Sequence, residues 1–353
     1  MPASPGSRLA AFVDRSVVRF MERRMAPRTP PIADDARAKL IELAAAYGAG
    51  TLGLPSRFFP EPSPPAMSLD PRGDGPSGTQ VVDLSWRSDY APFLDQGRDG
   101  YLAVAENAIA RARWWTSDRG RPTIVLLHGW GGGNVWVTER TFAVGYWLRH
   151  GYDVVAFTLP LHGERAPGPS GATFPSPNPL RTNEGFGQAI FDLRAVAGWL
   201  RARGSSAVGA MGMSLGGYTT ALWASVDREL AFAVAMIPAV SMSSLMWRHG
   251  ESSPQRKKAL AAGITEDLLA DAFAVHAPTT RPAAIARDRL FVIAGRGDRI
   301  TPPDQAEALA AHWGVDIAWF EGGHLAQLGR DRALRATRQK LGALGLPGRT
   351  FRG

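Results

Sequence analysis

Short, continuous runs of apolar residues recur along the chain from about residue 81 onward, and segments with helical periodicity separate them. Runs of this length between helical segments are typical of strands that are buried on both faces of a parallel sheet. The expected strands cover 123–127, 153–159, 207–211, 232–237, 290–294 and 317–320, and the expected helices cover 138–150, 184–203, 217–225, 303–313 and 331–341. The pattern therefore predicts an α/β fold with a mostly parallel central sheet flanked by helices.

Two earlier segments, 81–86 and 108–115, are candidates for the first strands. The second alternates small or aromatic residues with polar ones, which favours an antiparallel or edge strand. Two later segments interrupt the strand–helix alternation: 161–183 is a long loop rich in Pro and Gly, and 239–286 separates two strands. Insertions after parallel strands often form lids over a site, so we expect 239–286 to be a helical cap with helices near 253–262 and 265–273.

The N-terminal region has helical periodicity, and we treat 1–54 as a helical extension. Apolar and basic residues of its first helix fall on different faces, the apolar ones being Leu9, Val13, Val17, Phe20 and Met21 and the basic ones Arg8, Arg15, Arg19 and Arg23. A second helix is expected from Asp34 or Asp35 to Tyr47, ending at Gly48. Residues 55–80 are rich in Pro, Gly and Ser, which predicts a linker or an extended wrap before the main domain at 81–345.

The first helix has two possible partners. We expect its apolar face to pack on the body of the protein or on a second subunit. The alternative is a peripheral contact of residues 8–25 with an anionic lipid surface through the arginine face. The oligomeric state is left open.

Composition limits the class of protein. Of the 353 residues, 45% are apolar and 20% are charged, which suits a soluble globular protein with a sizeable core. No apolar run approaches the roughly 20 residues of a membrane span, and we expect no secretory signal. Cysteine is absent, which excludes disulfides, thiolate metal sites and a cysteine nucleophile. We expect a cytoplasmic protein.

The net charge is +8, and all but four of the 40 basic residues are arginine. A nucleic-acid-binding protein gathers basic and aromatic residues into a patch or motif. The arginines here are scattered outside the first helix, so we expect no nucleic-acid partner.

A Gly-x-Ser-x-Gly motif occurs at residues 212–216, directly after an apolar run and before a helical segment. A tight strand-to-helix turn of this kind exposes one serine hydroxyl above the sheet. Glycine is needed because a side chain would collide inside so sharp a turn. We therefore predict that Ser214 is a nucleophile, the ordinary alternative being a helix N-cap serine.

Two further groups follow later expected strands. His324 comes after 317–320 and a pair of glycines, and an imidazole there can take the serine proton and return it to a leaving group. Asp298 comes after 290–294, where a buried carboxylate would orient the histidine. The ordinary alternatives are a surface histidine and a turn aspartate, and Asp304 and Glu321 are weaker substitutes for the acid.

The oxyanion formed in acyl transfer needs backbone donors. Leu215, directly after the nucleophile, supplies one amide, and the glycine-rich run 128–133 supplies the other, for which we choose Trp130. The run can also be a plain flexible loop. A phosphate-binding loop is not expected, because no Gly-Lys-Ser/Thr follows.

These motifs together resemble the α/β-hydrolases of the esterase and lipase type over residues 81–345. The resemblance implies catalytic Ser214, Asp298 and His324, in the chain order that this family uses, and a structural rather than catalytic His162. The Gly216-Gly217-Tyr218 extension is similar to prolyl-oligopeptidase-like and dienelactone-hydrolase-like members. We expect no propeller-sized N-terminal domain, which weakens the prolyl-oligopeptidase version of a peptidase.

The cap region contains Met246 and Trp247, which we assign to substrate binding because they favour an apolar acyl group. The alternative is that they only pack the cap onto the body. We expect no cofactor and no metal, because no histidine pair has metal-ligand spacing.

The sequence therefore predicts a serine hydrolase that cleaves a carboxylic ester through an acyl-enzyme, with a small-molecule ester as its partner. A peptidase or thioesterase would use the same groups, and an enzyme acting at a lipid surface is a further possibility. A non-catalytic binding protein on the same fold is the alternative from another class.

Overall fold

The computed structural model describes residues 4–25, 32–48, 50–117, 119–176, 178–251 and 253–347. In the first helix, α1 Pro5–Met25, side chains are described only at positions 5–16 and 18. Five of the residues singled out on the first helix therefore lie outside the described side chains, namely Val17, Arg19, Phe20, Met21 and Arg23.

One nine-stranded sheet forms the centre of the molecule, with the strand order β1-β2-β3-β5-β4-β6-β7-β8-β9. The strands are β1 Ser68–Asp74, β2 Gln80–Arg87, β3 Ile109–Thr116, β4 Thr123–Leu127, β5 Asp153–Phe157, β6 Val208–Met213, β7 Ala233–Met236, β8 Leu290–Gly295 and β9 Ile317–Phe320. β1, β2, β3 and β5 pair antiparallel in turn, and every pair from β5 through β4 to β9 is parallel. The predicted fold class, a mostly parallel sheet flanked by helices, is confirmed.

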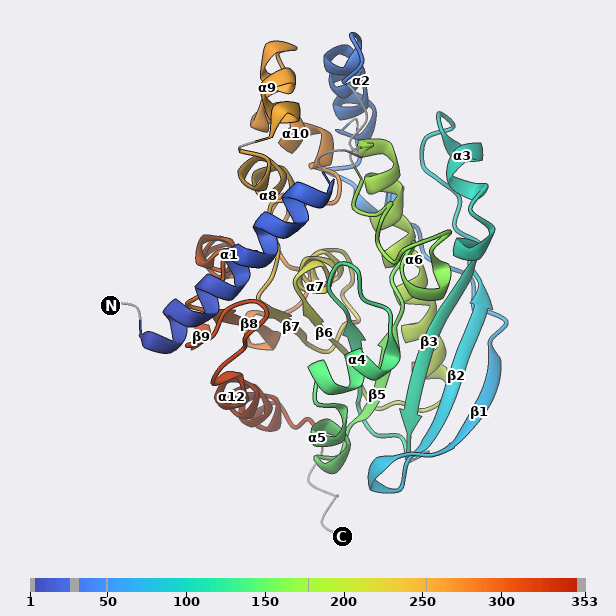
Figure 1. Cartoon of the computed structure of the whole chain (residues 1–353). Coiled ribbons are helices and arrows are strands. Elements are labelled where there is room, and N and C mark those ends of the chain that lie inside the picture. Colours follow the sequence, from blue (N-terminus) through green and yellow to red (C-terminus); the bar gives the residue numbers. More distant parts are fainter. Residues whose placement is uncertain are drawn as a thin grey trace.

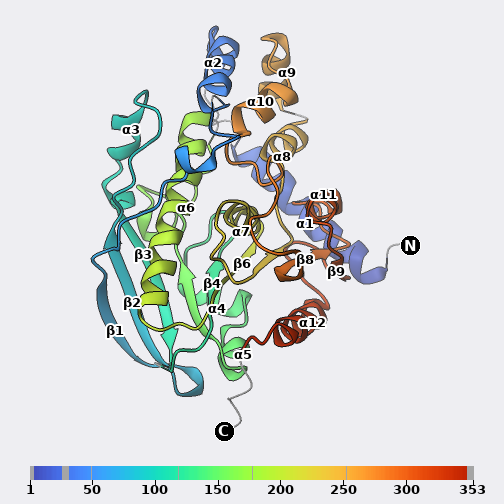
Figure 2. The same cartoon turned by 180° about the vertical axis from the view of Figure 1, so that it is seen from behind.

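Helices cover both faces of this sheet (Figures 1 and 2). They are α1 Pro5–Met25, α2 Ala36–Gly48, α3 Arg98–Leu102, α4 Val135–Thr141, α5 Val144–Arg149, α6 Pro179–Ala202, α7 Leu215–Val226, α8 Met242–His249, α9 Pro254–Ala261, α10 Glu266–Phe273, α11 Pro303–Trp313 and α12 Arg330–Ala343. α6, α7 and α11 bury side chains on one face, and α5 and α12 bury side chains on the other. None of the helices in the described ranges has both the length and the apolarity to cross a lipid bilayer.

Several predicted segments differ from the structure. α6 begins at Pro179, inside the loop predicted at 161–183. The helix expected at 138–150 is two helices, α4 and α5, because Ala143 between them has a left-handed backbone with φ of 52°. The segment 55–80 is more than a linker, since it contains β1, which pairs along β2. All seven residues of β1 are exposed, so the segment carries no apolar signal and the sheet begins before residue 81.

The cap predicted at 239–286 contains α8, α9 and α10, between β7 and β8. α2 from the N-terminal region stands beside these helices at the top of Figure 1. Leu40 of α2 packs with Ile264 and Ala272 of the cap in a small cluster of buried residues. Part of the N-terminal extension is thus built into the cap.

α2 is also held to the body of the protein. The Tyr47 hydroxyl donates a 2.6 Å hydrogen bond to Glu184 of α6, and the Tyr90 hydroxyl donates another of 2.6 Å to the same carboxylate. The Phe93 amide donates a third, at 2.9 Å. Because Glu184 is fully buried, these donors stabilise a carboxylate that would otherwise be costly to remove from water.

Candidate active site

Ser214 lies at the turn between β6 and α7, with φ of 58° and ψ of −115°. A left-handed backbone at a residue other than glycine is strained and persists only where the surroundings impose it. Here β6 and α7 approach closely: a Cβ at Gly212 would collide with the Gly216 carbonyl oxygen, and one at Gly216 would collide with that of Leu127. The glycines of the motif are therefore required by packing, and the turn presents Ser214 at the carboxyl end of the sheet.

Asp298 and His324 form a buried pair. Asp298 follows β8 and His324 follows β9, and the His324 Nδ1 atom lies 2.8 Å from Asp298 Oδ2. The exposed fractions of the two residues are 1% and 7%. The carboxylate can only accept, so the ring carries its proton on Nδ1 and leaves Nε2 free to accept another.

The Asp298 carboxylate is fixed by further donors. Its Oδ1 accepts the backbone amides of Ile300 at 2.9 Å and of Thr301 at 2.8 Å. The Thr301 hydroxyl lies 3.1 Å from Oδ2, 3.0 Å from His324 Nδ1 and 2.9 Å from the Ile237 carbonyl oxygen, to which it donates. Thr301 was not singled out from the sequence, although its place in the turn after Asp298 is a usable signal.

The loop that carries His324 contacts the nucleophile turn. Gln327 donates through Nε2 to the Met213 sulfur at 3.2 Å and to the His324 carbonyl oxygen at 2.8 Å. Gln327 thereby joins the histidine loop to the residue that precedes Ser214. In the part of the chain that the structure describes, no hydrogen bond joins the Ser214 hydroxyl to the His324 ring; such contacts are often loose without substrate.

The glycine-rich loop after β4 lies against the nucleophile. A Cβ at Gly129 would be 3.4 Å from the Ser214 Cβ. Within the described ranges, the backbone amides of Trp130 and Leu215 donate no hydrogen bond, and Leu215 is the first residue of α7. Free amides at a helix N-terminus attract negative charge. The Trp130 side chain points elsewhere, donating to the Gly171 carbonyl oxygen at 2.8 Å.

Two buried histidines lie beneath this loop. His128 Nε2 accepts the Leu159 amide, so its Nδ1 donates to the Gly129 carbonyl oxygen at 2.8 Å. Burial lowers the pKa of His128 to about 3 and that of His162 to about 4. Both rings are therefore neutral near pH 7, and His128 shapes the loop through backbone hydrogen bonds.

Met246 and Trp247 line a cavity between α2 and the cap helices. Its volume is about 640 Å³, and its apolar lining includes Leu40, Leu43, Met246, Trp247, Ile264 and Phe273. Ser214, Asp298 and His324 are not among the residues that line this cavity. The segment that leads into α8 does contact the nucleophile turn, because the Ala239 amide donates to the Ser214 carbonyl oxygen at 3.1 Å.

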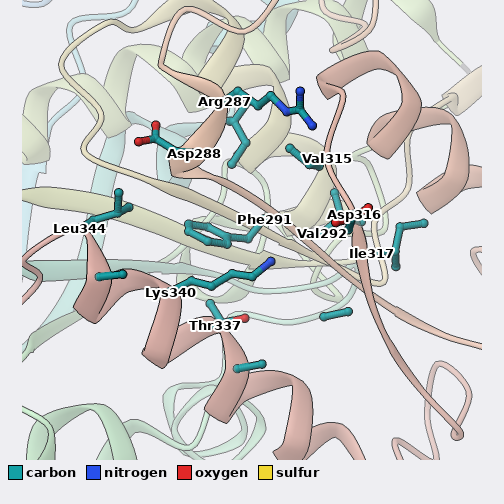
Figure 3. Close-up of a pocket in the computed structure, with 14 residues that line it drawn as sticks. Arg287, Asp288, Phe291, Val292, Val315, Asp316, Ile317, Thr337, Lys340 and Leu344 are labelled. Carbon is teal, nitrogen blue, oxygen red and sulfur yellow. The ribbon is translucent and has the colours of Figure 1, made fainter.

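A second cavity lies far from these groups. It has a volume of about 680 Å³ and is lined by residues such as Arg287, Phe291 and Lys340, which Figure 3 shows around its walls. Leu290 and Ile317, the first residues of β8 and β9, also line it. The cavity is therefore at the amino ends of these strands, opposite the edge that carries Asp298 and His324.

Among the residues that the structure describes, no three His, Cys, Asp or Glu side chains group as a metal ion would need. The carboxyl edge of the sheet brings together a hydroxyl, an imidazole and a carboxylate, with backbone amides beside them.

Residues 187–313 match the prolyl oligopeptidase family. This segment includes Ser214 and Asp298 and ends before His324. Uncharacterized proteins from two strains of Mycobacterium tuberculosis are each 29% identical to the chain, over 286 and 284 residues. These alignments cover 78% and 77% of this chain and 67% and 66% of the relatives, so the chain spans about two thirds of their length.

Two solved esterase structures are similar in fold. Acetyl xylan esterase from a Paenibacillus species has a TM-score of 0.55 at 14% identity, with 91% of this chain and 98% of that chain covered. Acetyl xylan esterase 1 from a Thermoanaerobacterium species has a TM-score of 0.54 at 16% identity, with 88% and 95% covered. The chain has the α/β-hydrolase fold, and the resemblance inferred from its motifs is confirmed at that level.

Proposed function

We propose, from the premise of an α/β-hydrolase fold, that this protein is a serine hydrolase that cleaves a carboxylic ester through an acyl-enzyme. The single observation that carries the proposal is the buried 2.8 Å pair of Asp298 and His324, joined through Gln327 to the strained turn that holds Ser214. A polar pair of this kind is costly to bury, and its geometry suits the activation of a serine.

In the proposed mechanism, His324 Nε2 takes the Ser214 proton as Oγ attacks the ester carbonyl carbon. The Trp130 and Leu215 amides stabilise the negative charge that develops on the carbonyl oxygen. His324 then protonates the leaving alcohol, and the acyl group stays on Ser214. Water, deprotonated by His324, attacks the acyl-enzyme and releases the acid. Asp298 holds the ring tautomer and stabilises the imidazolium in both halves of the reaction.

Two observations favour an ester over a peptide. The structures with the TM-scores reported above are esterases, and the cap cavity beside α8 is apolar, with a volume typical of small-molecule sites of about 300–1,000 Å³. The match to the prolyl oligopeptidase family keeps a peptidase as the second candidate. We assign the acyl group of the ester to the cavity lined by Met246 and Trp247.

The experiment is a substrate series measured with the full chain. We expect p-nitrophenyl esters to be hydrolysed in preference to matched acyl thioesters and to a proline-containing peptide p-nitroanilide. Ser214→Ala should abolish hydrolysis. Peptide cleavage that exceeds ester cleavage would replace the proposal by a peptidase, and hydrolysis that survives in Ser214→Ala would remove the nucleophile.

The cap assignment is tested with the same series from acetate to palmitate. Met246→Ala and Trp247→Ala should each lower kcat/KM for long esters by about 10- to 100-fold while leaving acetate nearly unchanged, because a lost pocket contact costs about 1–3 kcal/mol. Leu260→Ala is the matched control, since Leu260 is an exposed apolar residue of the cap that does not line the cavity. Equal losses for short and long esters would refute the assignment.

A specific observation also favours action at a lipid surface. Of the apolar face expected for the first helix, Leu9 is 60% exposed and Val13 is half-buried, and the other members lie outside the described side chains. Phe12, which was not assigned to that face, is 67% exposed, whereas Ala10, Ala11 and Asp14 are buried. Leu325 and Leu328, in the loop after His324, are exposed as well. A basic protein with exposed apolar residues beside its active site is suited to anionic lipid.

We expect the full chain to float with anionic liposomes and not with neutral ones. The double variant Leu9→Ser, Phe12→Ser should lose flotation and keep its hydrolysis of soluble esters. Leu260→Ser, at an exposed apolar position of the cap, serves as the control. Absence of flotation in the unaltered chain would reject the lipid contact and leave the esterase proposal in place.

A further inference from the structure

Asp14 of α1 contacts the two loops that carry Asp298 and His324. Its carboxylate is fully buried. Oδ2 accepts the backbone amide of His324 at 2.8 Å and that of Arg299, the residue after Asp298, at 3.1 Å. Oδ1 accepts the amide of Leu325 at 3.1 Å. One side chain from the N-terminal helix therefore accepts hydrogen bonds from the loop after Asp298 and from the loop that carries His324.

The loops are shaped to receive this helix. A Cβ at Gly323, directly before His324, would lie 2.6 Å from Asp14 Oδ2 and 3.1 Å from the Ala10 Cβ. A Cβ at Gly297, directly before Asp298, would lie 2.6 Å from the Ser7 carbonyl oxygen. α1 contacts the loops through small residues at these positions, so its backbone reaches the two glycines.

A buried carboxylate needs compensation, and Asp14 obtains it from backbone amides. Among the described residues, three backbone amides donate hydrogen bonds to the Asp14 carboxylate. Hydrogen bonds from neutral amides to an ionised oxygen are short and directional, and they fix the positions of the atoms that donate. Those atoms belong to His324 itself and to Arg299 and Leu325, which directly follow Asp298 and His324.

We infer that Asp14 is a positioning residue, which sets the separation and orientation of Asp298 and His324 by clamping their backbones. The inference rests on the roles proposed above for that pair. It makes α1, which precedes the sheet in the chain, part of the active site, and it gives a reason why the helix buries Asp14 while Leu9 and Phe12 stay exposed. Loss of the hydrogen bonds between Asp14 and these backbone amides should reduce turnover without changing the substrate pocket.

The test compares Asp14→Ala and Asp14→Asn with the unaltered chain. Burst titration counts competent sites, so that kcat is expressed per site rather than per mass of protein. In Asp14→Ala we expect kcat to fall by about 100-fold, as for a displacement of catalytic groups by roughly 1 Å, with KM nearly unchanged. In Asp14→Asn the carbonyl oxygen keeps two of the three amides, and the fall should be about tenfold.

Ser7→Ala is the matched control, because Ser7 lies on the same buried face and donates to Glu321 at 3.0 Å without touching either amide of the pair. If α1 only stabilises the fold, all three variants should have fewer titratable sites and the same kcat per site as the unaltered chain. That result would overturn the inference. If Asp14→Ala does not fold, Asp14→Asn decides: an unchanged kcat per site counts against positioning.

A second readout does not depend on the substrate. The His324 Nδ1 proton, shared with Asp298, gives a downfield resonance in protein with 15N-labelled histidine rings. We expect this resonance to shift or disappear in Asp14→Ala and to persist in Ser7→Ala. An unchanged resonance in folded Asp14→Ala would refute the positioning role of Asp14. If the unaltered chain hydrolyses no ester, a resonance lost only in the Asp14 variants still supports positioning, and the proposed function alone fails.

Discussion

Replacing Asp298 by asparagine perturbs one hydrogen bond of the candidate triad while conserving its shape. Asp298 Oδ1 accepts two backbone amides, whereas Oδ2 faces His324 Nδ1 and the Thr301 hydroxyl. In Asp298→Asn the amide NH₂ group cannot face the two amide donors, so it takes the Oδ2 position. There it donates toward His324, and the ring must present Nδ1 as an acceptor.

The consequence is a change of tautomer. A neutral His324 with Nδ1 unprotonated carries its proton on Nε2, where it cannot accept the proton of Ser214. The expected loss is about four orders of magnitude in kcat, which corresponds to about 5 kcal/mol of transition-state stabilisation. Stability should change by only about 1 kcal/mol, because both backbone amides keep their acceptor. Asp298→Ala would leave both without one and cost more.

The assay is hydrolysis of a p-nitrophenyl ester together with the rate of labelling by a fluorophosphonate, with thermal unfolding as the check on stability. Asp304→Asn and Glu321→Gln are matched controls, because these acids are the weaker substitutes and bind Arg248 and Ser7 instead of His324. Activity of Asp298→Asn within about tenfold of the unaltered chain would refute the tautomer argument. So would an equal loss in either control.

Three further outcomes concern stability. Gly216→Ala should yield little folded protein in expression trials, because its Cβ would collide with the Leu127 carbonyl oxygen; a normal melting temperature would contradict this. Arg165→Met should lower the free energy of unfolding by about 3–5 kcal/mol in urea melts, because it strands the buried charge of Asp192, and a loss below about 1 kcal/mol would contradict it. Acidification should also destabilise the protein through His128, His162 and His276. Burial holds the pKa values of these histidines at about 3 to 4, below their unfolded value of about 6.5, so the unfolded chain binds more protons as the pH falls. Their contribution to stability is complete above pH 6.5. Between pH 6.5 and 5 the free energy of unfolding should decrease by up to about 4 kcal/mol per pH unit. Urea melts at several pH values will check this, and a flat profile would disprove it.

The parallel core was predictable because its strands are buried on both faces. β4 and β9 begin and end where their apolar runs do. The edge strand β1, at the opposite end of the sheet from β9, was not predictable, because it is exposed along its whole length and contains a proline and a glycine. The break between α4 and α5 occurs at Ala143, a residue that favours helices in isolation, so tertiary packing decides it.

The candidate site was likewise predictable in part. The turn around Ser214 follows from local glycine chemistry, and the positions of Asp298 and His324 follow from the shared carboxyl edge of parallel strands. Their catalytic roles stay predictions. Asp14 could not be found in this way, because it meets His324 across more than 300 positions of sequence and no local motif marks it. Periodicity also favoured burial of Leu9, whereas close approach to Gly323 and Gly297 selects a face of small residues.

Labelling of the full chain with a fluorophosphonate, followed by mass spectrometry of the labelled peptide, tests directly whether Ser214 is an activated nucleophile. We expect one modification, on Ser214, with no labelling in Ser214→Ala and almost none in His324→Ala. Folded, unaltered protein that resists the probe, or carries it on another serine, would contradict an activated Ser214 and favour a binding protein on the same fold.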